Sequence, residues 1–193
     1  LTGGSIENTD TSVCYFGAGN PGLGAINTAF TNNGDAEVSP YYGGCCTEPV
    51  INMSGGSITN NGTINATGSG GIRYVGLSNG TFINNAGGVI NSNVGDVSFG
   101  EPSFRMQPAS FTNLGTINVL RNIMELGAFA VGGVINVSPG TLLRSTGTIT
   151  FNGSLINNNG NITVPFDFIN AAAKTLKGNG TFSSDVALNN AAT

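Results

Sequence analysis

The stretch Gly56-Ser57-Ile58-Thr59-Asn60-Asn61-Gly62-Thr63-Ile64-Asn65-Ala66-Thr67-Gly68 sets the pattern for most of the chain. It predicts two short strands, over residues 57–59 and 63–66, because polar and apolar residues alternate in both. The Asn-Asn-Gly between them is typical of a tight turn. The stretch therefore predicts a unit made of a strand, a corner and a second strand.

The same pattern returns along the sequence. Copies occupy residues 81–91, 110–119, 143–151 and 155–164, and a worn copy occupies residues 129–137. Their consensus is apolar, polar, Asn, any residue, Gly, Thr, Ile, Asn or Thr, and Val. Self-similarity of this kind indicates a repeat architecture, in which each unit buries its apolar face against its neighbours.

The isoleucine after each corner predicts the core. In residues 63–66 and 116–119, alternation directs Ile to one face of the strand and Thr and Asn to the other. If each strand pairs with its equivalent one turn above and below, isoleucine stacks on isoleucine inside the coil. The uneven spacing of these isoleucines indicates turns of differing loop length, some with two corners of one type. The expected stack is Ile64, Ile90, Ile117, Ile135, Ile149 and Ile162.

The corners carry glycine and asparagine. These residues adopt the left-handed backbone conformation most readily, so we expect it at the bends. Asparagines at equivalent corners can also form a hydrogen-bonded ladder along the stack. The expected corner residues are Asn61, Gly62, Asn85, Gly87, Asn113, Gly115, Gly147, Asn159 and Gly160.

The amino-acid composition excludes some classes of function. Gly and Asn together make up about 30% of the 193 residues, whereas charged residues make up 8%. The net charge is −4 and the six Lys and Arg are scattered, so no basic surface for nucleic acid is expected. No apolar run is long enough to span a membrane. Since 39% of residues are hydrophobic and sit at patterned positions, the chain is expected to fold.

The motif copies resemble a known architecture. The Asn-x-Gly-Thr-Ile-Asn-Val copies, with the later Leu176-Lys177-Gly178-Asn179-Gly180-Thr181-Phe182, are similar to right-handed parallel β-helix repeats of large bacterial surface proteins. Autotransporter-like and filamentous-haemagglutinin-like adhesins are among these proteins. The resemblance covers residues 56–190 and implies an all-β, right-handed parallel β-helix. At about 20 residues per turn, this solenoid has roughly nine irregular coils with loop insertions.

The chain is expected to form one continuous solenoid with two regions. Residues 1–55 hold irregular coils and an insertion, and residues 56–193 hold the regular coils. Cys14, Cys45 and Cys46 all lie in the first region. A disulfide from Cys14 to Cys45 or Cys46 would pin the insertion and suits an oxidising compartment. The alternative is three unpaired thiols in a reducing cell.

Residues suited to catalysis are sparse. Histidine is absent and no Cys-x-x-Cys occurs, so we expect no metal and no cofactor. A glycosidase needs two carboxylates across one bond, and Asp35 with Glu37 is the close acidic pair in the sequence. We therefore expect no catalytic residues. A groove that joined Asp35 and Glu37, or Asp96 and Glu101, to an arginine would favour a polysaccharide enzyme; the arginines concerned are Arg73 and Arg105.

These observations favour a structural protein at a bacterial cell surface or outside the cell, in a Gram-negative host. We expect an adhesin stalk or a self-assembling filament subunit without catalysis. Its expected partners are copies of itself or further coils of the same chain, joined end to end, and surface glycans. The alternative is a β-helix protein that binds or cleaves polysaccharides.

Overall fold

The computed structural model of the chain describes residues 3–9, 13–16, 23–38, 51–67, 74–78, 80–93, 104–106, 110–127, 129–145, 149–151, 155–158, 161–164, 168–170, 175–177, 181–184 and 188–190. Every regular element in these segments is a β-strand, and every strand pair is parallel. The described part of the chain is therefore all-β, as the alternating pattern predicted.

The strands lie in three rows. Row A consists of β7 (Tyr74–Ser78), β10 (Phe104–Met106), β13 (Ile123–Leu126), β16 (Leu142–Ser145), β19 (Asn161–Val164) and β22 (Thr181–Ser184). Row B consists of β1 (Ser5–Asn8), β8 (Thr81–Asn84), β11 (Ser110–Asn113), β14 (Phe129–Val131), β17 (Ile149–Phe151), β20 (Phe168–Asn170) and β23 (Leu188–Asn190). Row C consists of β2 (Val13–Phe16), β4 (Asp35–Val38), β6 (Thr63–Ala66), β9 (Val89–Ser92), β12 (Thr116–Val119), β15 (Val134–Val137), β18 (Leu155–Asn158) and β21 (Thr175–Lys177).

Two long strands join rows A and B. The first half of β5 (Ile51–Asn60) pairs with β7 of row A, and its second half pairs with β8 of row B. The long strand β3 (Leu23–Asn32) lies beside β5 over both halves. Rows A and B therefore form one 15-stranded sheet, and row C forms a separate 8-stranded sheet.

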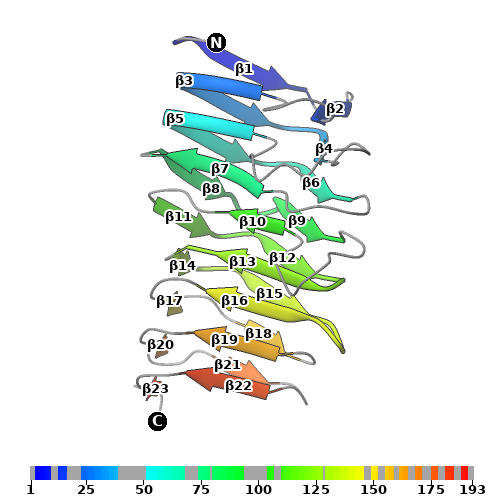
Figure 1. Cartoon of the computed structure of the whole chain (residues 1–193), viewed down its shortest axis with the longest axis vertical. Helices are drawn as coiled ribbons and strands as arrows, with labels where there is room; N and C mark the ends of the chain where they lie inside the picture. The colour runs from blue at the N-terminus through cyan, green and yellow to red at the C-terminus, as the bar shows by residue number, and fades with distance from the viewer. Residues whose placement is uncertain are drawn as a thin grey trace, which may run out of the picture.

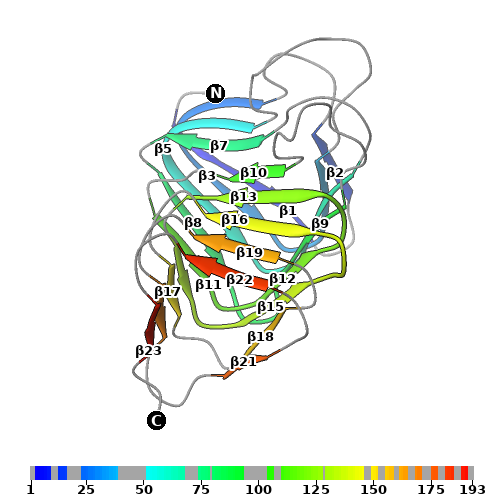
Figure 2. The same cartoon turned by 60° about the horizontal axis from the view of Figure 1, so that its bottom comes forward.

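The chain visits the rows in a fixed order, A then B then C, before returning to row A. From β7 to β21 this order repeats without exception, so each strand pairs with strands one pass earlier and one pass later. The described strands make nine passes: β1–β2, β3–β4, β5–β6, five triplets from β7 to β21, and β22–β23. Figure 1 shows the passes stacked along the longest axis, with β1 at one end and β22 and β23 at the other, and Figure 2 shows the rows around that axis.

The passes differ in length most at the connection from row C to row A. After β4, β6 and β9 this connection is long and covers residues 39–50, 67–73 and 93–103. After β12, β15, β18 and β21 it is short and covers residues 120–122, 138–141, 159–160 and 178–180. The boundary expected at residues 55 and 56 falls inside the continuous strand β5. The change from long to short turns thus comes after β12.

The core lies between the three rows. Inward side chains of β6, β9, β12 and β15 place Ile64, Ile90, Ile117 and Ile135 in one register column, each at most 5% exposed. In row B, Phe82 and Phe111 occupy successive passes and meet edge to face, with ring centroids 5.1 Å apart. In β6 and β12, Thr and Asn are partly exposed and the residue that follows each is buried, which confirms the predicted alternation of outward Thr and Asn with inward Ile.

The expected stack of six isoleucines is divided among the rows. Row C continues from Ile135 to Ile156. Ile149, in β17, belongs to row B beside Phe129 and Phe168, and Ile162, in β19, belongs to row A beside Leu143 and Phe182. The chain from Ile135 to Ile149, and again from Ile149 to Ile162, is shorter than a full pass, so these two residues fall on other rows.

Candidate functional site

The corner between rows B and C carries a buried ladder of asparagines. Asn8, Asn32, Asn60, Asn84 and Asn113 end successive row B strands, and each is at most 5% exposed. Each side-chain amide nitrogen donates to the side-chain oxygen of the next asparagine toward the C-terminal end, at 2.7 Å in all four steps. We call this series the inner ladder.

The inner ladder also binds the backbone of the corner. Asn84 Nδ2 donates to Asn113 Oδ1, and it contacts the carbonyl oxygens of Gly88 and Thr116 at 3.2 and 3.3 Å. Its own Oδ1 accepts from Asn60. Donor and acceptor are both satisfied inside the protein, which removes the cost of burying an amide. The ladder therefore fixes the corner of one pass to the corner of the next.

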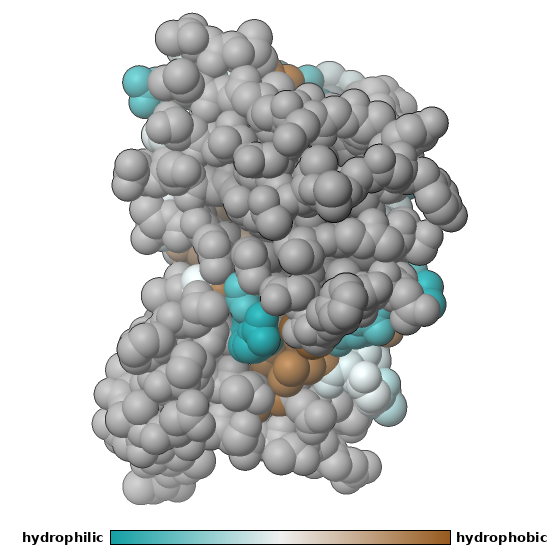
Figure 3. Space-filling model, viewed as in Figure 1, coloured by the Kyte–Doolittle hydropathy of each residue, from teal (hydrophilic) through white to brown (hydrophobic). Residues whose placement is uncertain are grey.

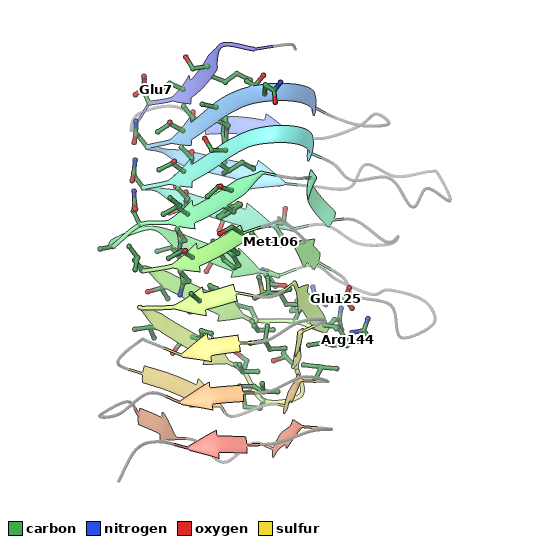
Figure 4. The ribbon with its side chains drawn as sticks, turned by 90° about the vertical axis from the view of Figure 1, so that its left-hand side faces the viewer. Glu7, Met106, Glu125 and Arg144 are labelled. Atoms are coloured by element: carbon green, nitrogen blue, oxygen red, sulfur yellow. The ribbon has the colours of Figure 1, made fainter. Side chains whose placement is uncertain are left out.

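A second series lies beside it on the surface. Asn85 donates to Asn61, Asn61 donates to Asn33, and Asn33 Nδ2 donates to Glu7 Oε1, at 2.7, 2.7 and 2.8 Å. We call this series the outer ladder. Its amide donors point toward the N-terminal end, opposite to those of the inner ladder. Figure 4 shows Glu7 at the N-terminal end of the stack, where its carboxylate accepts the last of these bonds.

A third series runs up the outer face of row C. Asn136 donates to Asn118, Asn118 to Asn91, and Asn91 to Asn65, at 2.7 to 2.8 Å. We call it the row C ladder. These asparagines are partly exposed and face outward beside the buried isoleucines.

Two of the expected corner glycines serve a different purpose from the one expected. Among the described residues, the non-glycine positions with positive φ are Asn27 and Asn122, so Asn61, Asn85 and Asn113 do not bend the chain in this way. Of the expected corner glycines, Gly87 has a positive φ of 92°, whereas Gly62 and Gly115 do not. A Cβ on Gly62 would collide with the carbonyl oxygen of Gly34, and one on Gly115 with that of Gly88. Close approach of stacked corners requires these glycines.

One ion pair lies on the outer side of row A. Glu125 of β13 is 3% exposed, and Arg144 of β16 occupies the equivalent position one pass later. Arg144 Nε donates to Glu125 Oε2 at 2.6 Å, and Nη2 lies 2.5 Å from the same oxygen. Arg105 occupies the register position on the other side of Glu125, in β10. Figure 4 shows Glu125 and Arg144 on neighbouring strands, directed toward each other.

The surface of row A is mixed in character. Ile123 and Leu142, register partners on β13 and β16, lie near the ion pair, and Ile123 is partly exposed. On this face, Figure 3 shows hydrophobic and hydrophilic described residues side by side. Row C, by contrast, presents Thr, Val and Asn over β6 to β15.

Of the acids considered for a polysaccharide enzyme, Asp35 and Glu37 lie two positions apart on the outward face of β4. Asp35 and Glu37 belong to row C, where Glu37 Oε1 accepts a hydrogen bond from Thr67 Oγ1 at 2.8 Å. Arg105 belongs to row A, and Asp96, Glu101 and Arg73 lie outside the described residues. Within the described segments, no group of three His, Cys, Asp or Glu side chains is placed to hold a metal ion.

Several of the predicted residues lie outside the described part of the chain. Cys14 lies in β2, and Cys45 and Cys46 are outside the described residues, so the disulfide stays a prediction. Gly147, Asn159 and Gly160 are also outside them. Of the repeat copies, residues 143–151 run from row A to row B and residues 155–164 from row C to row A, so neither contains a B–C corner.

Sequence reasoning missed Asn8, Asn32, Asn60 and Asn84 of the inner ladder. For the last three the signal was present, because each stands two positions after a core residue: Phe30, Ile58 and Phe82. Alternation puts residues two apart on the same face of a strand. In the pairs Asn32-Asn33, Asn60-Asn61 and Asn84-Asn85, the first asparagine is therefore buried and the second joins the outer ladder.

No protein-family model, curated protein or solved structure matches the chain. Among the described residues, no helix is present that is long and apolar enough to cross a lipid bilayer.

Proposed function

We propose that the chain is a right-handed parallel β-helix that acts as a structural segment of a secreted or surface-displayed bacterial protein. In this role it is an adhesin stalk or a filament subunit, and it performs no catalysis. The observation that best supports this proposal is the in-register repetition of identical residues along row C. Ile64, Ile90, Ile117, Ile135 and Ile156 share one column, and Asn65, Asn91, Asn118, Asn136 and Asn157 share another.

The repetition supports a mechanical role. When each pass binds the next through the same contacts, the free energy of unfolding is approximately a sum of contributions from single passes and from the contacts between neighbouring passes. More passes can then be added without any change in the core. Backbone ladders in three rows and the inner ladder resist separation of the passes. The strong preference of parallel strands for right-handed crossovers supports the proposed handedness.

The long connections supply the proposed binding role. The three that follow β4, β6 and β9 leave from the same corner, between rows C and A. Loops carried on a rigid scaffold are a common position for binding residues. We place the contacts of an adhesin, including contacts with surface glycans, in these loops.

Electron microscopy of the native material, combined with small-angle X-ray scattering, tests the proposal. Nine passes at about 4.8 Å each predict a rod about 43 Å long. Helically repeating fibres would identify a filament subunit, and isolated rods would identify a stalk. A scattering profile without elongation would overturn the proposal. Release of reducing sugar from a polysaccharide panel, lost in Asp35→Asn and Glu37→Gln variants, would establish the catalytic alternative instead.

A further inference from the structure

The outer face of row C carries no charged residue from β6 to β15. From β6 to β15, one outward column holds Thr63, Val89, Thr116 and Val134, and the other holds the row C ladder. All of these residues are partly exposed. Their side chains are short, and the asparagine amides bond to one another along the stack.

Residues of opposite charge occupy the same register column on the two sides of the row C ladder. Glu37 precedes Asn65 in register, and Lys177 follows Asn157. The whole sequence has the same polarity: residues 1–72 contain five acids and no base, whereas residues 73–193 contain five acids and six bases. The sequence over residues 1–72 is therefore negative by five charges, and residues 73–193 are positive by one.

We propose that row C binds row C of a second copy of this chain, face to face and antiparallel. A two-fold axis along the strand direction at β12 places Asn118 opposite its own counterpart. Because the stack direction reverses while the strand direction is kept, Glu37 comes opposite Lys177 at both ends of the contact. The same operation places Val89 opposite Val134 and Asn91 opposite Asn136. The contact is isologous, as in most homodimers.

The register follows from the equal spacing of the passes. Glu37 lies three passes before Asn118, and Lys177 lies three passes after it. A parallel arrangement would instead place Glu37 against Glu37 and Lys177 against Lys177, which is unfavourable. Charge therefore selects the antiparallel form.

The size of the strip sets the strength of the contact. Strands of this length are about 13 Å long, and six steps between β4 and β21 span about 29 Å. Such a face covers about 380 Å² on each copy, so the contact buries roughly 800 Å² in total, at the low end for a specific interface. The dimer is therefore weak and reversible, and it is separate from the proposed end-to-end assembly.

Sedimentation equilibrium from about 1 µM to about 1 mM protein tests the inference. The unmodified chain is expected to dimerise as the concentration rises. Asn118→Arg places two like charges at the axis and is expected to raise the dissociation constant about tenfold or more. Thr112→Arg, on the outer side of row B, is the matched control and is expected to leave the constant within about twofold.

Charge reversal tests the register. Glu37→Lys and Lys177→Glu are each expected to weaken self-association, because each homodimer then opposes like charges twice. An equimolar mixture of the two variants restores both opposite-charge pairs and is expected to dimerise about as tightly as the unmodified chain. A chain that stays monomeric throughout would overturn the inference. So would dimers that Asn118→Arg leaves unchanged, or a mixture no tighter than its components.

Discussion

Asn33 donates a hydrogen bond from Nδ2 to Glu7 Oε1 at 2.8 Å, and this bond ends the outer ladder on a carboxylate. In this ladder every amide donates toward the N-terminal end, so the last donor meets an anion. A charge-assisted bond of this kind is stronger than one between neutral groups. The inner ladder runs in the opposite direction a single residue away, as in the bonds from Asn60 to Asn84 and from Asn84 to Asn113.

The two ladders predict that the same substitution at adjacent positions lowers the unfolding free energy by unequal amounts. Asn84→Asp replaces a buried donor with a carboxylate, which then faces the carbonyl oxygens of Gly88 and Thr116. We expect a loss of about 3 kcal/mol or more in unfolding free energy. Asn85→Asp removes an exposed bond to Asn61 and is expected to cost less than about 1 kcal/mol. Urea unfolding followed by circular dichroism measures both, and equal losses would contradict the buried position of Asn84.

The glycines at the corner between rows B and C predict a loss of stability when they are replaced by alanine. Gly115→Ala introduces a Cβ that meets the carbonyl oxygens of Gly88 and Asn85, so the corners of two passes must separate. We expect this to cost about 2–4 kcal/mol, as for other backbone clashes. Thermal or urea unfolding of the variant measures the loss.

Gly140 supplies the matched control for Gly115. It lies in the turn Ser138-Pro139-Gly140-Thr141, where Thr141 N donates to Ser138 O, and its φ is 75° with open space at the Cβ position. Gly140→Ala is therefore expected to cost about 1–2 kcal/mol, from backbone strain alone. A loss for Gly115→Ala no larger than that for Gly140→Ala would contradict close packing of the corners.

The alternation of single strands could be predicted from the sequence, but their assignment to rows could not. Ile117 is buried as predicted, because period-2 alternation depends on local sequence alone. Ile149 follows an almost identical motif and lies in row B. Its row depends on how much chain separates it from the previous corner and on which strands the chain meets there. The consensus of the repeat specifies neither the length of that connection nor the strands that pair there.

The corner chemistry was also only partly predictable. Glycine at positions 62 and 115 was expected for its backbone freedom, yet the structure requires it because another backbone lies against it. Such contacts come from residues one pass away, between Gly62 and Gly34 or between Gly115 and Gly88. A local pattern identifies the residue type but not the neighbour that demands it.

Ser92 gives a prediction of increased stability. It faces the core of row C at 0% exposure, between Ala66 and Val119 in register, and its Oγ has no hydrogen-bond partner among the described residues. Burial of a hydroxyl without a partner costs free energy. Ser92→Ala is therefore expected to raise the unfolding free energy by about 1 kcal/mol. A decrease in the urea midpoint would show that the hydroxyl is satisfied within the protein.

The ion pair of row A predicts that removal of its arginine lowers the unfolding free energy, because its carboxylate is buried. Arg144→Gln removes the cation that lies against Glu125, whose side chain is 4% exposed. The carboxylate then stays buried with less compensation, and we expect a loss of about 1–3 kcal/mol. Arg121→Gln, at an exposed arginine in the turn before β13, is the control and is expected to change stability by less than about 0.5 kcal/mol.

Urea is the required denaturant for the arginine comparison, since guanidinium salt would screen the pair. Arg144→Lys keeps a positive charge but loses the planar fork through which Nε and Nη2 both reach Glu125 Oε2. It is therefore expected to recover only part of the loss seen for Arg144→Gln. If Arg144→Gln and Arg121→Gln lowered the unfolding free energy by the same small amount, contacts other than Arg144 would compensate the buried charge of Glu125. The ion pair would then not stabilise the packing of β13 against β16.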